Sequence, residues 1–126
     1  MENTKSVYTF ALFFLLSTTA VMAADFLKAD KIKSLVSGKT IHAKHLKKGF
    51  TFTVFFDTDG KTAFRKQAGK TTKTTYKIVG DTHCIFWKGS DRCANIIDNG
   101  NGTYSRVNVG GKKIVDWTKI ENGKNL

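Results

Sequence analysis

Beyond Gly38 the chain alternates between apolar and polar residues in short runs that glycine-containing turns separate. A period of two places successive side chains on opposite faces of a β-strand. The pattern predicts eight strands, at residues 40–46, 50–56, 62–67, 72–79, 84–88, 93–97, 103–109 and 113–120. Strands that follow one another at intervals of about ten residues, without helices between them, form an antiparallel meander.

The predicted strands have one apolar and one polar face. Phe50, Phe52, Val54 and Phe56 share one face of the second strand, which suits a wall with a dry side. A long meander hides its edges best by curling into a small barrel or by folding into two packed sheets. The predicted fold class is therefore mainly β: a short N-terminal helix followed by an antiparallel meander of about eight strands, forming a small barrel or a sandwich.

The helix is predicted over residues 25–37. Ile32, Leu35 and Val36 follow helical spacing, Asp30 is a candidate N-terminal cap, and Gly38 suits a left-handed stop.

Residues 1–23 are typical of a signal peptide. Lys5 gives a positive start, residues 8–16 form an apolar run, and small or apolar residues precede Ala24. A membrane span is the alternative, but the run is shorter than the roughly 20 residues that cross a bilayer. We expect cleavage, no membrane span, and a single β-rich domain over residues 24–126 that acts in the periplasm or outside the cell.

Cys84 and Cys93 are the two cysteines, and they flank a predicted turn at Lys88 and Gly89. An even loop centred there places the two cysteines directly opposite each other on one face of a hairpin. Export favours a structural disulfide. A redox or metal-binding pair and free thiols are the alternatives, although the spacing is not C-x-x-C.

The sequence is strongly basic, with 21 Lys plus Arg against 10 Asp plus Glu and a formal net charge of +11. A net charge of about 2 to 8 is enough to keep a small protein soluble. The larger charge of this chain is therefore explained either by solubility or by binding to an anionic partner. The predicted binding residues lie near the end of the first strand and around the hairpin of the third and fourth strands. They are Lys44, Lys47, Lys48, Arg65, Lys66, Lys70, Lys73 and Lys77.

Candidate reactive groups are sparse. His42, His45 and His83 are the three histidines. Their positions in the predicted strands do not bring them together around a metal ion. Asp57 and Asp59 begin a pattern like a calcium loop, but the later ligands are missing, which favours a plain turn. No nucleophile elbow is present. We therefore predict no catalytic residues, no cofactor and no metal site.

Short motifs along the chain resemble an uncharacterised group of small exported bacterial β-rich proteins. They are Gly38-Lys39-Thr40, Phe56 with Asp59-Gly60, Cys84-Ile85-Phe86-Trp87 with Cys93, and Gly111-Lys112. The resemblance implies a compact β domain and transfers no catalytic residue.

The sequence thus predicts a small exported, non-catalytic binding protein whose basic surface recognises an anionic envelope polymer or an acidic protein. Nucleic acid is a poor partner for an exported protein. Two other functions stay open: a barrel that carries a small apolar ligand against Phe50, Phe52, Val54 and Phe56, and an inhibitor of an extracytoplasmic enzyme. The positive net charge argues against an inhibitor of a basic enzyme, because two positively charged proteins repel each other. The oligomeric state is not predicted.

Overall fold

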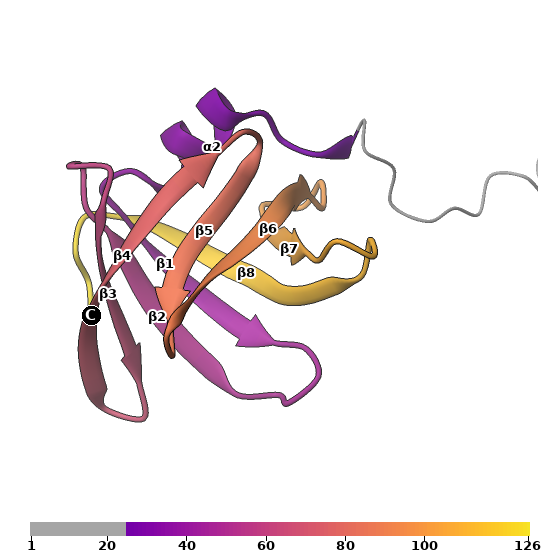
Figure 1. Ribbon diagram of the computed structural model, residues 1–126. Helices are drawn as coiled ribbons and strands as arrows, with labels where there is room; N and C mark the ends of the chain where they lie inside the picture. The colour runs from indigo at the N-terminus through magenta and orange to yellow at the C-terminus, as the bar shows by residue number, and fades with distance from the viewer. Residues whose placement is uncertain (1–24) are drawn as a thin grey trace, which may run out of the picture.

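The structure is a computed structural model that describes residues 25–126, so the predicted signal peptide at 1–23 lies outside the described residues. It is a closed barrel of eight antiparallel strands in sequence order, in which β1 also pairs with β8 (Figure 1). Because the sheet closes on itself, the fold is the barrel and not the sandwich of the two predicted arrangements. The elements are α2 (Ala29–Val36), β1 (Lys39–His45), β2 (Thr51–Phe56), β3 (Thr62–Gln67), β4 (Lys70–Val79), β5 (Thr82–Trp87), β6 (Ser90–Asp98), β7 (Tyr104–Val107) and β8 (Lys113–Asn122).

The helix α2 covers one end of the barrel, at the top in Figure 1. Its buried residues Ile32 and Val36 belong to the same apolar cluster as the barrel interior. The helix is shorter than predicted because Phe26 bridges to Ile97 and the Leu27 amide donates to the Ile96 carbonyl, which keeps this segment extended. Lys28 is therefore the N-cap, and the prediction that Asp30 caps the helix is wrong.

The helix ends where the sequence predicts. Gly38 has φ +70°, and a Cβ there would meet the Thr58 methyl group at 3.0 Å. Both the backbone angle and the close approach require glycine. The chain can therefore reverse directly from α2 into β1.

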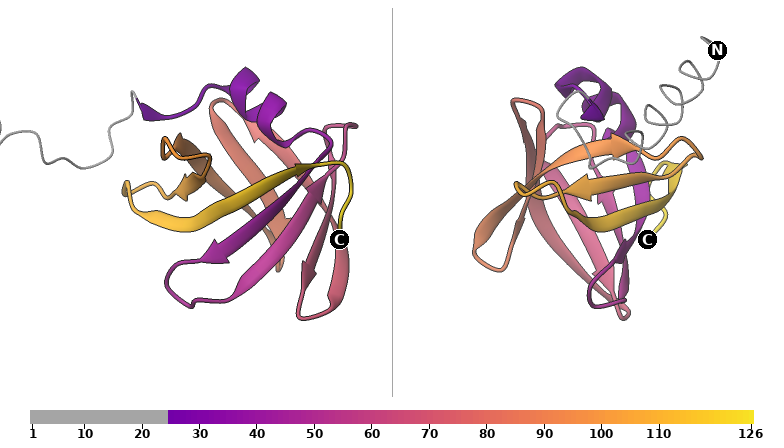
Figure 2. Two further views of the ribbon diagram at one scale, coloured as in Figure 1. Left: turned by 180° about the vertical axis from the view of Figure 1, so that it is seen from behind. Right: turned by 90° about the vertical axis from the view of Figure 1, so that its right-hand side faces the viewer.

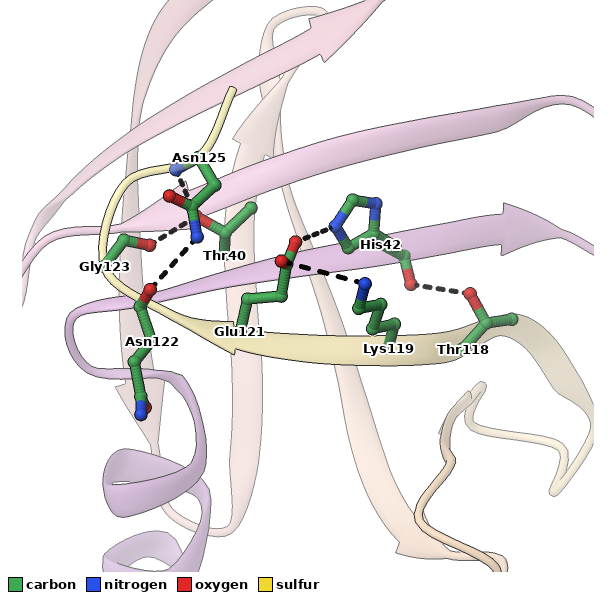
Figure 3. Close-up of polar contacts among 8 residues, drawn as sticks. All are labelled: Thr40, His42, Thr118, Lys119, Glu121, Asn122, Gly123 and Asn125. Atoms are coloured by element: carbon green, nitrogen blue, oxygen red, sulfur yellow. Dashed lines mark hydrogen bonds and ion pairs between the residues drawn. The ribbon is translucent and has the colours of Figure 1, made fainter.

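The barrel closes along the seam between β1 and β8 (Figure 3). Thr40, which is 0% exposed, donates from Oγ1 to the Gly123 carbonyl at 2.5 Å and accepts from the Asn125 amide at 2.9 Å. On the outer face, His42 contacts the carboxylate of Glu121. These contacts tie the C-terminal residues to the first strand.

The disulfide between Cys84 and Cys93 is present as predicted. The two cysteines are register partners in the β5–β6 hairpin, with Cα atoms 4.0 Å apart. Lys88 and Gly89 both have positive φ, at 50° and 84°. Positive φ at both central residues is the geometry of a tight two-residue hairpin turn, which fixes the register that joins the sulfurs.

At the end opposite α2, the β5–β6 hairpin separates from its neighbours. Residues 70–75 of β4 pair with β3, and only residues 76–79 pair with β5. Likewise, residues 90–94 of β6 pair with β5, and only residues 95–98 pair with β7. The hairpin tip therefore stands away from the rest of the wall (Figure 2, right).

Replacing both cysteines (Cys84→Ala with Cys93→Ala) is expected to lower the free energy of unfolding by about 2–3 kcal/mol, because the closed loop constrains the unfolded chain. Urea unfolding of the oxidised protein and of the double variant measures the difference. Reduced wild-type protein is the control and should match the double variant. Equal stability of all three would contradict a stabilising disulfide.

A candidate ligand-binding cavity inside the barrel

The barrel encloses a cavity of about 540 Å³ that opens at the end opposite α2. Exposed residues from the hairpin loops, among them Lys48 and Lys88, stand at its mouth. The face predicted to be dry, Phe50, Phe52, Val54 and Phe56, lines one wall as expected. Further apolar lining comes from Ile41, Ala43, Ile85, Trp87, Ile114, Val115 and Trp117. The interior is therefore a largely apolar chamber with several aromatic side chains in its wall.

Arg106 of β7 lies inside this cavity and is 7% exposed. Its Nη1 donates to His83 Nδ1 at 2.6 Å, and its Nη2 donates to the carbonyls of His83 and Arg92 at 3.2 and 2.9 Å. Within residues 25–126, no ion pair joins it to a carboxylate. Burial lowers the pKa of Arg106 to about 10, so the side chain is a cation at neutral pH that neutral groups alone hold.

His83 of β5 forms part of the inner end of the cavity, where its ring meets Phe56 and Trp117 edge to face at centroid distances of 4.8 and 5.5 Å. Burial, and then the charge of Arg106, hold its pKa well below the ordinary value. Because a guanidinium only donates, Nδ1 must be the acceptor, and the proton of the neutral ring is on Nε2. In the described part of the chain, Nε2 is the buried side-chain polar atom without a partner.

Arg65 of β3 is the second cation of the interior, also 7% exposed. Its guanidinium carbon lies 4.1 Å from the centre of the Phe52 ring and 4.2 Å from that of Trp87, and Nη1 donates to Gln67 at 2.6 Å. Aromatic faces on both sides stabilise the cation. The prediction that Arg65 belongs to a basic outer surface is wrong, because its side chain points into the barrel.

Charge differs between the two ends of the barrel. Of the nine carboxylate residues in the described range, seven lie at the α2 end: Asp25, Asp30, Asp57, Asp59, Asp81, Asp98 and Glu121. The loops at the open end carry Lys47, Lys48, Lys88 and Lys112. At the mouth, Asp91 forms an ion pair with Lys77 at 3.1 Å. The entrance is thus the more basic end.

The structure divides the predicted binding residues into groups. Lys48 and Arg65 line the cavity. Lys47 and Lys70 are exposed at the open end, and Lys66 is half-buried close to it. The remaining three, Lys44, Lys73 and Lys77, are exposed on the outer wall.

Arg106 and His83 are absent from the sequence-based binding set. In β7 the residues Ser105, Arg106 and Val107 are all buried, so alternation does not separate an inner from an outer face there. His83 is completely buried. Trp87, whose ring lies against the guanidinium of Arg65, lines the cavity.

Across residues 25–126, no group of three or more His, Cys, Asp or Glu side chains is placed to hold a metal ion. The same range contains no helix long and apolar enough to cross a membrane. Comparisons with protein-family models, curated proteins and solved structures find no match to this chain. The resemblance to exported bacterial proteins therefore stays a prediction, and function must be argued from the cavity.

The burial of His83 predicts a loss of stability in mild acid. The unfolded chain takes up a proton near pH 6.5, whereas the folded ring, with its lowered pKa, resists it. Stability contributed by the neutral ring is present above about pH 6.5 and falls below it, by about 1 kcal/mol between pH 7.5 and 5.5. Urea unfolding across this range measures the slope.

The matched variants for this test are His83→Gln and His45→Gln. The first should flatten the decline, and the second, at a half-buried position, should retain it. An unchanged slope in His83→Gln would show that another group causes the acid sensitivity.

Proposed function

We propose that this protein is a non-catalytic binding protein that takes a small ligand, with an apolar body and a negative group, into its barrel through the open end. The observation that carries the proposal is the open cavity of about 540 Å³, whose lining includes a buried arginine, Arg106, that has no carboxylate partner within residues 25–126. Small-ligand sites are commonly cavities of about 300–1,000 Å³ with apolar linings and a few placed polar groups.

The charge of the lining favours an anion. Five cationic residues, Lys48, Arg65, Lys88, Arg92 and Arg106, line the cavity against one carboxylate residue, Asp91. A buried unpaired cation is costly, and an anionic ligand that enters the cavity offsets this cost. Lysines at the mouth raise the local concentration of anions and speed their entry at low ionic strength.

This proposal keeps the anionic partner expected from the sequence and moves its site from the outer surface to the interior. A polymer or a folded acidic protein is too large for the chamber and would contact only the outer lysines, which leaves Arg106 unpaired. Export remains part of the proposal. The Cys84–Cys93 disulfide is compatible with an oxidising compartment.

Binding of the amphiphilic anion 1-anilinonaphthalene-8-sulfonate, followed by its fluorescence, tests the proposal. Ile114→Trp introduces bulk into the cavity lining and should weaken binding by about tenfold or more, since overfilling a packed interior costs about 1–3 kcal/mol. Near-UV circular dichroism checks that both proteins keep fixed tertiary packing, because loosely folded proteins also bind this dye.

Thr75→Trp is the matched control. It adds the same side chain on the exposed outer face of β4 and should leave the affinity unchanged. A triple variant, Lys44→Glu, Lys73→Glu and Lys77→Glu, tests the outer lysines. If that triple variant loses binding while Ile114→Trp retains it, the ligand site is the outer surface and the proposal is wrong.

A further inference from the structure

We infer that the open end of the barrel is a docking surface for an anionic lipid bilayer, with the β1–β2 and β7–β8 loops in contact with the lipid. Two features of that end carry the inference: exposed apolar side chains in its loops, and lysines around them. The inference goes beyond the proposed function, because it does not depend on the cavity holding a ligand.

The large apolar side chains that stay exposed are concentrated at the open end. In the described residues they are Leu46, Phe86, Val79 and Val109, with exposed fractions of 40%, 43%, 53% and 104%. Leu46 and Val109 lie in the loops after β1 and β7, and Phe86 lies near the tip of the β5–β6 hairpin. Val79 alone ends its strand at the α2 end. A single exposed apolar residue needs no explanation, whereas a group at one end indicates a contact surface.

The loops that carry Leu46 and Val109 are neighbours. The Leu46 amide donates to the Ile114 carbonyl at 3.0 Å, which holds the β1–β2 loop against the start of β8. The β7–β8 loop leads into the same strand and is closed by the Asn108 amide, which donates to the Lys112 carbonyl at 2.9 Å. Both loops project away from α2 (Figure 1), so one surface can contact both apolar side chains.

Lysines surround these apolar side chains. Lys47, Lys48 and Lys112 are exposed in the same two loops, and Lys88 is exposed at the tip of the β5–β6 hairpin. Each lysine held near an anionic membrane strengthens binding about fivefold. Because seven of the nine carboxylate residues within 25–126 lie at the α2 end, an anionic surface attracts the open end more strongly than the α2 end.

The apolar side chains favour a bilayer over a soluble acidic polymer or protein. A polyanion would pair with the lysines and leave Leu46 and Val109 in water. A bilayer presents anionic head groups and, below them, apolar acyl chains, so it can contact the lysines and the apolar side chains together. Val109 is fully exposed and contributes little to the packing of the barrel. An interface with lipid therefore explains its apolar side chain better than the core does.

Docking by this end also places the cavity entrance against the membrane. Lys48 belongs both to the cavity lining and to the proposed docking surface. If the cavity holds an amphiphile, as proposed above, the ligand then passes between bilayer and barrel without crossing bulk water.

Co-sedimentation of the wild-type protein with lipid vesicles tests the inference. Phosphatidylcholine vesicles with about 30% phosphatidylglycerol should bind it at least about tenfold more tightly than vesicles of phosphatidylcholine alone. Raising sodium chloride from about 0.1 M to 1 M shortens the Debye length from about 10 to 3 Å and should remove most of this difference. Equal binding to both kinds of vesicle, or binding to neither, rules out an anionic lipid surface as the partner.

The double variant Leu46→Ser with Val109→Ser tests the apolar contact. It should weaken binding to the anionic vesicles about tenfold, because burial of two aliphatic side chains is lost. Val79→Ser is the matched control, since it removes an exposed valine at the α2 end and should bind as the wild type does. Equal effects of the two changes would show that the loops do not enter the lipid.

The double variant Lys47→Gln with Lys48→Gln tests the charge of the surface and should weaken vesicle binding about 25-fold. Lys31→Gln with Lys33→Gln removes the same charge from exposed positions on α2 and should have a much smaller effect. A larger loss in the α2 pair would place the contact at the opposite end of the barrel.

A label at Val109 reads the orientation without disturbing the core. Val109→Cys carrying an environment-sensitive fluorophore should shift its emission to the blue on addition of anionic vesicles, because the label leaves water. The same fluorophore on Val79→Cys should not shift. Equal shifts at both positions, or none at Val109, would overturn docking by the open end.

Soluble poly-glutamate represents the alternative partner. If it binds the wild-type protein as tightly as the anionic vesicles do, and the Leu46 and Val109 double variant binds both as the wild type does, the partner is a soluble polyanion and the inference is wrong.

The docking inference and the proposed function fail separately. If the fluorescent anion enters the cavity but the open end does not bind vesicles, only the docking inference is wrong. If vesicles bind the open end and the anion does not enter the cavity, the proposed function is wrong and the docking surface stands.

Discussion

The buried guanidinium of Arg106 is the constraint on which the interior depends. A cation removed from water needs hydrogen-bond acceptors, and in this barrel they are the carbonyls of His83 and Arg92 and the Nδ1 atom of His83. The Arg92 carbonyl is available because β6 pairs with β7 only from Asn95 onward. The interruption of the strand ladder thus provides an acceptor for the buried charge, and the charge in turn keeps the interior polar on one side.

The same interruption shapes the cavity. Eight strands are enough to enclose a small ligand when side chains do not fill the interior, and here α2 fills one end only. At the other end, the ladders that join the β5–β6 hairpin to β4 and to β7 stop at Tyr76 and Asn95, and Trp87 and Lys48 line the cavity that opens there. The disulfide joins Cys84, which still pairs with Lys77 of β4, to Cys93, which lies outside the ladder between β6 and β7.

Sequence periodicity predicted the fold well, because most strands have one face in contact with the core. It predicted the inward face of β2, the turn at Lys88 and Gly89, and the pairing of Cys84 with Cys93. It could not place the candidate site. Alternation says nothing where both faces are buried, as in β7, and a basic residue within a polar run, such as Arg65, reads as exposed until the barrel closes around it. Those placements depend on contacts between strands distant in the sequence.

The separated β5–β6 hairpin also bears on how copies of this chain behave toward one another. Residues 90–94 of β6 pair with β5 on one side, and their other side lacks the ladder to β7 that begins at Asn95. An open strand edge is a template for intermolecular sheet growth and amyloid-like aggregation. Lys88, Asp91 and Arg92 are exposed at or next to this edge, so it carries charged side chains of both signs. Charged side chains along a strand edge disfavour the pairing of that edge with a second chain.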